Sequence, residues 1–120
     1  MKLSAITLNT ENMPAAVRFY QWLGLELHRG GEDAPFSTFQ IGTMHLNLRR
    51  VPECLKSSES PLVIFTVADV DAYHSQFLFA GYEVEFAPRD ADWGERYFHA
   101  RDPSGNRLSF TSKLISGHRS

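Results

Sequence analysis

The feature that most constrains the fold of this chain is an internal repeat. Residues 6–27, ITLNTENMPAAVRFYQWLGLEL, align with residues 63–84, VIFTVADVDAYHSQFLFAGYEV, at a constant offset of 57 and without a gap. Asn12 in the first copy corresponds to Asp69 in the second, and Gly24 corresponds to Gly81. Because a repeat marks one supersecondary unit that recurs, the chain is expected to contain the same small module twice.

Each copy carries the start and stop signals of one amphipathic helix. Asn12 and Asp69 are N-cap residues, whose side chains accept a hydrogen bond from a free backbone N–H of the first turn. Gly24 and Gly81 suit the left-handed conformation in which many helices end. We therefore expect two helices of about three turns. Their apolar residues recur at helical spacing: Ala16, Tyr20 and Leu23 in the first, and Val70, Tyr73, Phe77 and Ala80 in the second.

Segments in which polar and apolar residues alternate flank both helices and predict strands. One precedes each helix, at residues 2–9 and 61–67, and three follow it, at residues 25–30, 36–42 and 44–50 in the first copy and 83–88, 95–101 and 106–112 in the second. The prediction is a single α+β domain made of two tandem βαβββ modules. Module 1 covers residues 1–49, a linker covers 50–60, module 2 covers 61–113 and a tail covers 114–120.

The composition excludes several classes of partner. The chain has 120 residues, 42% of them hydrophobic, and a net charge of -2. It has no apolar run near the ~20 residues of a membrane span and no signal-like N-terminus, so we expect a cytoplasmic protein without membrane contact. Arg49 and Arg50 form its only basic cluster, which argues against nucleic acid. Cys54 is the only cysteine, so no disulfide within the chain is possible. The expected partner is a small molecule.

Alternation also predicts which side chains leave the core. Leu46 and Leu48 are expected to pack under the first helix, and Phe98 and Phe110 under the second, so that their neighbours lie on the opposite face of each sheet. That open face mixes polar and aromatic side chains and is expected to line a half-polar cleft. From it and its adjoining loops come the candidate ligand-binding residues Thr7, Asn9, Phe36, His45, Asn47, Trp93, Tyr97, His99, Arg107 and Ser109.

One stretch, WGERYFHARDPSGNRLSF at residues 93–110, combines a turn with two alternating segments. Asp102, Pro103, Ser104 and Gly105 have the composition of a structural type I turn. Trp93 allows two interpretations that the sequence does not separate. Its indole either caps the edge of the sheet or offers a flat face on which a ligand stacks.

These features together resemble the glyoxalase / bleomycin-resistance / ring-cleaving dioxygenase superfamily, also called vicinal oxygen chelate proteins. The resemblance rests on the repeat, on the FY and LG pairs of the first helix and on the DPSGN turn, and it covers about Leu3 to Thr111. It implies curled mixed sheets that form a cleft, usually in a homodimer. It does not imply one reaction, because this fold hosts isomerases, dioxygenases and proteins that only bind.

The resemblance also implies where catalytic members hold a divalent metal ion: on the first and the last strand of each module. Ala5, Asn47, Leu62 and Ser109 occupy those positions here. None is an imidazole or a carboxylate, and Ala and Leu carry no donor atom. We therefore expect no metal or other cofactor, although His45 and His99 leave open a rebuilt site.

Three functions remain as hypotheses. The preferred one is a non-catalytic binding protein of the bleomycin-resistance type, which sequesters a drug or metabolite. The second is an enzyme, of a lyase, isomerase or dioxygenase-like kind, that uses an unusual metal set or takes His45 or His99 as a metal-free base. The third is a scaffold that only dimerises. The replaced metal ligands favour the first, and the polar open face disfavours the third.

Overall fold

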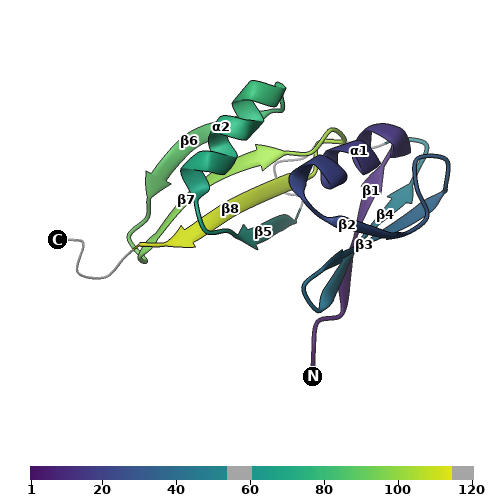
Figure 1. Ribbon diagram of the computed structural model, residues 1–120, viewed down its shortest axis with the longest axis horizontal. Helices are drawn as coiled ribbons and strands as arrows, with labels where there is room; N and C mark the ends of the chain where they lie inside the picture. Colours follow the sequence, from purple (N-terminus) through teal and green to yellow (C-terminus); the bar gives the residue numbers. More distant parts are fainter. Residues whose placement is uncertain (54–60, 115–120) are drawn as a thin grey trace. The chain divides into compact units, whose positions relative to one another are not determined.

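The computed structural model describes residues 1–53 and 61–114. Its elements are β1 (Ala5–Thr10), α1 (Met13–Leu23), β2 (Glu26–Arg29), β3 (Phe36–Ile41), β4 (Met44–Arg50), β5 (Leu62–Thr66), α2 (Val70–Ala80), β6 (Val84–Asp90), β7 (Glu95–Arg101) and β8 (Arg107–Lys113) (Figure 1). A strand, a helix and three strands follow one another twice, so the predicted pair of βαβββ modules is confirmed. Cys54 and residues 115–120 of the predicted tail lie outside the described ranges.

Each module forms one mixed sheet of four strands. The strand orders are β1-β4-β3-β2 and β5-β8-β7-β6. The first strand of each module pairs in parallel with the last, which places Ala5 beside His45 and Leu62 beside Arg107. The remaining pairs are antiparallel hairpins. A parallel pair needs a long crossover, which the rest of each module supplies.

Both helices begin and end at the predicted residues. The Asn12 Oδ1 atom accepts a hydrogen bond from Ala15 N at 3.1 Å, and Asp69 Oδ1 accepts one from Ala72 N at 3.1 Å. Gly24 and Gly81 end the helices with φ of 110° and 83°. These values lie in the left-handed region, where glycine has no Cβ to clash. The residues that recur at the offset of 57 therefore mark where each helix begins and ends.

The first core lies between α1 and one face of its sheet. Tyr20 of α1 is fully buried, and its ring centroid lies 5.9 Å from that of Phe39. Leu46 and Leu48 are buried beside them, as the alternation predicts. The buried face of α1 is broader than the predicted stripe, because it also contains Met13, Val17 and Phe19.

The second core is mainly aromatic. The Phe110 ring lies 5.2 Å from Phe65, 5.2 Å from Phe98 and 5.3 Å from Phe77 of α2. In Figure 1, α2 runs along one side of the sheet that carries β6, β7 and β8. Ala80 is exposed rather than part of the buried stripe, so that prediction is wrong; it lies at the frayed last position before Gly81.

The chain divides into two compact units. They correspond to the two modules, except that one short segment of module 2 belongs to the first unit. Pro103–Asn106, from the turn between β7 and β8, belong to the first unit. There the hydroxyl of Ser104 hydrogen bonds to that of Thr10, and Asn106 Nδ2 donates to Asn9 O at 2.9 Å. The turn predicted from its composition is therefore tied to the end of β1.

Several strand boundaries differ from the prediction, most of them by one residue. β1 begins at Ala5 rather than at residue 2, whereas β4 ends at Arg50 as predicted, which is also the first residue of the predicted linker. β6 continues through Pro88 to Asp90. Proline lacks an N–H for a sheet hydrogen bond, but β6 is an edge strand with an irregular register, where proline is tolerated.

A β-bulge interrupts the strand that follows the helix in each module. In β2, Leu27 pairs with Phe39 and Arg29 with Thr38, which leaves His28 as the extra residue. In β6, Val84 pairs with Ala100 and Phe86 with His99, which leaves Glu85 as the extra residue. His28 and Glu85 are separated by the same 57 positions as the two helices. A bulge changes the direction of side chains relative to plain alternation.

Candidate functional site: the open faces of the two sheets

The open face of the first sheet carries a row of hydrogen-bonded polar side chains. Thr38 Oγ1 on β3 donates to Asn47 Oδ1 on β4 at 2.9 Å, and Asn47 Nδ2 donates to Thr7 Oγ1 on β1 at 3.3 Å. The row follows from the strand register, which sets these three residues side by side. Thr7 and Asn47 therefore lie together on this face, as expected.

A second row lies one step further along the same strands. Arg49 Nε donates to Asn9 Oδ1 at 3.1 Å, and Phe36 is the β3 partner of Arg49. The Phe36 side chain remains 42% exposed. A cation, an amide and an aromatic ring thus adjoin one another, although Arg49 is not among the candidate residues expected from the sequence.

His45 has a neighbour that is not among the candidate residues expected from the sequence. The ring of His28 lies 5.7 Å from the ring of His45, centroid to centroid. The two residues are on β2 and β4, with β3 between them. No alternation rule predicts this contact, because it depends on the bulge at His28.

The open face of the second sheet carries a cluster of rings. Tyr97 lies 5.5 Å from Trp93, 5.5 Å from Phe86 and 5.3 Å from His99. Trp93 is 67% exposed, and its Nε1 donates to Glu95 Oε1 at 2.8 Å. An indole that caps a sheet edge would bury its face, so the exposure favours the second interpretation of Trp93, a flat surface open to a ligand.

Arg89 covers the other end of this cluster. Its guanidinium carbon lies 3.8 Å from the centroid of the Phe86 ring and 5.5 Å from that of Tyr97. Both distances are within the range of a cation–π interaction. Arg89 was absent from the candidate residues because the predicted strand ended at Pro88, whereas β6 continues to Asp90.

His99 lies between a carboxylate and several cations. Its Nδ1 atom is 3.8 Å from Glu85 Oε1, and Glu85 Oε2 is 3.1 Å from Arg101 Nη2. Burial lowers the pKa of His99, and the charges of Arg107 and Arg89 lower it further, while Glu85 opposes them. His99 is thus a neutral imidazole beside a carboxylate at neutral pH.

The carboxylate corrects one expectation. The residues expected on the open face include no Asp or Glu, and that is wrong because the bulge in β6 brings Glu85 to His99. Ser109, the β8 partner of His99, is only 4% exposed, so its hydroxyl presents little surface to a ligand. Thr111 Oγ1, two residues further, is buried and has no hydrogen-bond partner among the described residues.

Residues 2–110 match the family model of the glyoxalase/bleomycin resistance protein/dioxygenase superfamily. The chain belongs to this superfamily. The match covers both modules and ends at the last core position of β8, so the resemblance noted from the repeat and the turn is confirmed. No curated protein matches the chain.

Solved structures of superfamily members share the fold at low sequence identity. A lactoylglutathione lyase from Agrobacterium tumefaciens is 20% identical with a TM-score of 0.77, covering 97% of this chain and 96% of the other. A glyoxalase/dioxygenase from Nostoc punctiforme is 18% identical with a TM-score of 0.80, covering 95% and 92%. A glyoxalase/bleomycin resistance protein/dioxygenase from Nocardioides is 21% identical with a TM-score of 0.76, covering 98% and 86%.

The superfamily metal does not fit the residues at its usual positions in this chain. Asn47 has the only amide among them, and its oxygen already accepts from Thr38 while its nitrogen donates to Thr7. Ser109 is buried, and Ala5 and Leu62 have no donor atoms. A dication here would lose hydration without gaining anionic ligands. We derive no reaction step through such an ion.

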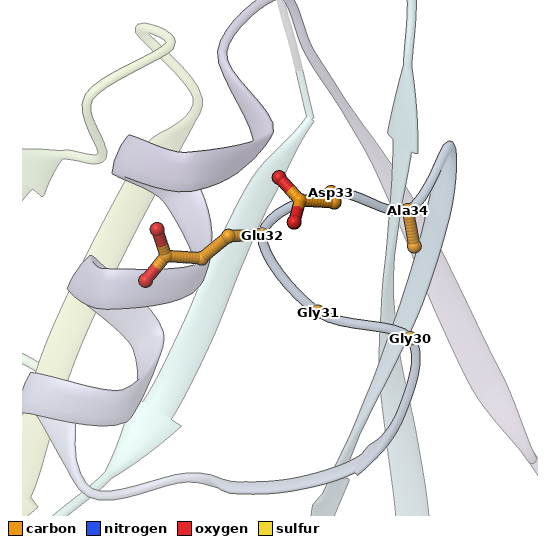
Figure 2. Close-up of a pocket in the computed structure, with 5 residues that line it drawn as sticks. All are labelled: Gly30, Gly31, Glu32, Asp33 and Ala34. Carbon is orange, nitrogen blue, oxygen red and sulfur yellow. The ribbon is translucent and has the colours of Figure 1, made fainter.

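A hollow in the first unit is formed by the loop between β2 and β3. It has a volume of about 420 Å³ and is lined by Gly30, Gly31, Glu32, Asp33 and Ala34 of the β2–β3 loop (Figure 2). Glu32 points toward α1, where its Oε1 atom forms an ion pair with Arg18 Nη1 at 2.9 Å. This lining has no ring on which a planar ligand could stack, so we place the candidate site on the open faces.

No helix in the described ranges is long and apolar enough to cross a membrane.

Proposed function

We propose that this superfamily member binds a planar organic molecule, a drug or a metabolite, and sequesters it without metal-dependent catalysis. The observation that carries the proposal is the exposed aromatic surface of Trp93 beside Tyr97. Aromatic rings in a folded domain are normally buried, and the core of the second module is complete without these two. A stacked ligand would remove this apolar surface from water.

The charges around the rings favour a neutral or anionic ligand over a cation. Arg89 covers Phe86, and Arg107 is close enough to His99 to lower its pKa. Glu85 is already paired with Arg101 at 3.1 Å, which offsets its charge. A carboxylate or phosphate on the ligand would form charge-assisted hydrogen bonds with the arginines.

The polar row of the first sheet is proposed as the second binding surface. Thr7, Asn9 and Asn47 offer hydrogen bonds there, and Phe36 and His45 offer partly exposed rings. We further propose that the protein acts in the cytoplasm as a homodimer. A half-apolar open face, which includes Ile64 at 62% exposure, supports assembly because water contact with such a surface is unfavourable.

A second candidate function rests on Glu85 and His99. The Nδ1 atom of the neutral imidazole lies 3.8 Å from the carboxylate, so a small side-chain rotation would bring the two into the hydrogen bond by which a carboxylate orients a general base. Glu85 would be a positioning residue and His99 Nε2 the atom that accepts a proton. Such an enzyme would act on a substrate stacked on the same rings.

Fluorescence of Trp93 tests the binding proposal. The chain contains two tryptophans, so a Trp22→Phe variant reports on Trp93 alone. Planar aromatic carboxylates, neutral aromatics and aromatic cations are titrated into this variant. Saturable quenching by the first two classes is expected, and Trp93→Ala should weaken the affinity measured by calorimetry about tenfold. Phe79→Ala, at a 96% exposed side chain on α2, is the matched control and should change nothing.

Two outcomes would count against the proposal. Equal binding by cations and anions, with no effect of Arg107→Ala, rejects the charge assignment. Unchanged affinity in Trp93→Ala rejects the site. Turnover of a bound compound that is lost in His99→Asn, with binding retained, would replace sequestration by the enzymatic alternative.

A further inference from the structure

The His28 and His45 rings form a pair on the first sheet, and only His45 belongs to the polar row proposed above as a binding surface. Their centroids lie 5.7 Å apart, with an angle of 41° between the ring planes. His28 is exposed and His45 is partly buried. Both belong to the first unit, on strands of one sheet.

Backbone features of the β2–β3 hairpin bring His28 to the side of His45. The β2 bulge makes His28 the extra residue, and Gly30 follows it with φ of 83°. A Cβ at Gly30 would lie 2.4 Å from Phe36 O, so only glycine fits where the β2–β3 loop begins. The buried Ser37 hydroxyl accepts from Gly31 N at 2.9 Å and donates to Gly31 O at 3.1 Å. The backbone position of His28 is therefore set by the bulge and the loop that follows it.

The spacing of the rings is slightly larger than that of two imidazoles on one metal ion. A ligating nitrogen lies about 2.05 Å from zinc, which puts a ring centroid roughly 3.2 Å from the ion. Two such rings at square-planar or tetrahedral angles have centroids roughly 4.5–5.3 Å apart. The observed 5.7 Å is within reach of that range by small side-chain rotations.

We propose that His28 and His45 form a binding site for a borderline transition-metal cation, with Cu²⁺ bound most tightly. Imidazole nitrogen suits copper, nickel and zinc, and copper leads the affinity order of divalent ions. Gln40 on β3 lies in register with His45, and its Nε2 donates to Gly42 O at 2.6 Å, so we assign the ion no third side-chain ligand among the described residues. Water completes the shell.

The ligand count makes this site an exchangeable one. The described residues contain no group of three or more His, Cys, Asp or Glu side chains that could share an ion. Two imidazoles without carboxylate charge leave the ion largely hydrated, so it equilibrates with the solution. The site is separate from Ala5, Asn47, Leu62 and Ser109, the positions at which the superfamily resemblance locates its metal.

Copper titration tests the proposal on the full chain. The His118→Ala variant is the reference protein, because His118 lies outside the described residues and can bind copper by itself. In a non-coordinating buffer we expect one equivalent of Cu²⁺ per chain, with a paramagnetic resonance spectrum that shows coupling to two nitrogens. His28→Ala should weaken the affinity about tenfold or more, and His45→Ala should do the same. The double variant should be no weaker than either single one, because each single change already destroys the pair.

A folding control for the His28→Ala variant makes the copper titration decisive. His28 is exposed, so His28→Ala is expected to fold normally, which circular dichroism checks, and it decides the matter even if His45→Ala is unstable. Undiminished Cu²⁺ affinity in His28→Ala would overturn the proposal, as would loss of all specific binding in the reference protein. The outcome is independent of Trp93, so a failed ligand screen and a failed copper titration are distinguishable.

Discussion

The hydroxyl groups of Thr10 and Ser104, 94 positions apart in the sequence, form a hydrogen bond inside the first unit. Thr10 is fully buried, and its Oγ1 also accepts from Asn12 N at 3.1 Å, at the start of α1. One side chain thus joins β1, the α1 N-cap and the turn between β7 and β8. The DPSGN turn has a packing partner rather than a catalytic one.

The same substitution should have opposite effects at two buried threonines. Thr10→Val removes the buried hydroxyl that bonds to the Ser104 hydroxyl and accepts from Asn12 N, and we expect it to lower the unfolding free energy by about 1–3 kcal/mol. Thr111→Val removes a buried hydroxyl that has no partner among the described residues, so it should be neutral or stabilising. Urea denaturation of both variants measures the difference. Equal losses of unfolding free energy at the two positions would show that the Thr111 hydroxyl does form a hydrogen bond in the folded protein.

Arg96 holds α2 to its sheet through two carboxylates. Its Nε and Nη2 atoms lie 2.9 Å from the Asp71 carboxylate of α2, and its Nη1 lies 3.0 Å from Asp90 Oδ1 of β6. The hydrogen bonds from Arg96 lower the pKa of Asp71. Arg96→Met should lower the unfolding free energy by about 0.5–1 kcal/mol, since the pair is largely exposed. Arg96→Lys should restore only part of this loss, because an ammonium cannot bind both Asp71 oxygens in a fork, and 1 M salt should shrink the differences.

The stability of the second unit should decrease as the pH falls through the range in which histidine titrates. Burial lowers the pKa of His99 in the folded chain below its ordinary value of 6.5. The unfolded chain therefore binds the proton more readily, so the contribution is complete above pH 6.5 and is lost as the pH falls toward the folded pKa. His99→Asn should flatten the dependence of the unfolding free energy on pH in that window.

Glu85 supplies a matched check on this assignment. Its negative charge favours the protonated ring, so Glu85→Gln should lower the pKa of His99 further, as followed by NMR titration of the imidazole. A pKa that rises in this variant would show that the carboxylate does not act on His99.

The metal content of the purified protein should be low. With Ala5, Asn47, Leu62 and Ser109 at the superfamily's ligand positions, untagged protein is expected to carry clearly less than one Ni, Zn, Fe or Mn per chain by elemental analysis. EDTA should leave the melting temperature unchanged, because only an ion bound to the native state adds stability by mass action. The exchangeable His28–His45 pair does not alter this expectation. Stoichiometric metal that is lost together with His45 and His99 would favour the enzymatic alternative.

The chain is expected to be a homodimer at micromolar concentration. Light scattering should give twice the mass of one chain, and dilution should weaken both the assembly and ligand binding if the interface contributes to the site. Ile64→Asp, at a 62% exposed position on the open face, should shift the protein toward the monomer. A monomer mass for the unsubstituted chain would remove the dimer from the proposal.

The helices and strands of each module could be predicted from the sequence because they depend on interactions between residues close together in the chain. Asn12, Asp69, Gly24 and Gly81 act through backbone groups within a few residues of themselves, so they specify where α1 and α2 begin and end in any context. Alternation placed Leu46, Leu48, Phe98 and Phe110 in the cores, because successive strand residues point to opposite faces. The repeat then implied two copies of one fold, and the residues at the metal positions showed the departure from the superfamily pattern.

The contacts of the candidate sites were decided only by tertiary structure. His28 reaches His45, and Glu85 reaches His99, because a bulge inserts one residue into a strand, and alternation along one strand says nothing about its partner's register. Arg89 joins the aromatic cluster because edge strand β6 continues past Pro88, where a central strand would have ended. Ser104 bonds to Thr10 because the fold brings together residues that no local rule connects. The sequence by itself determined the modules, whereas pairing between strands determined which side chains meet on their open faces.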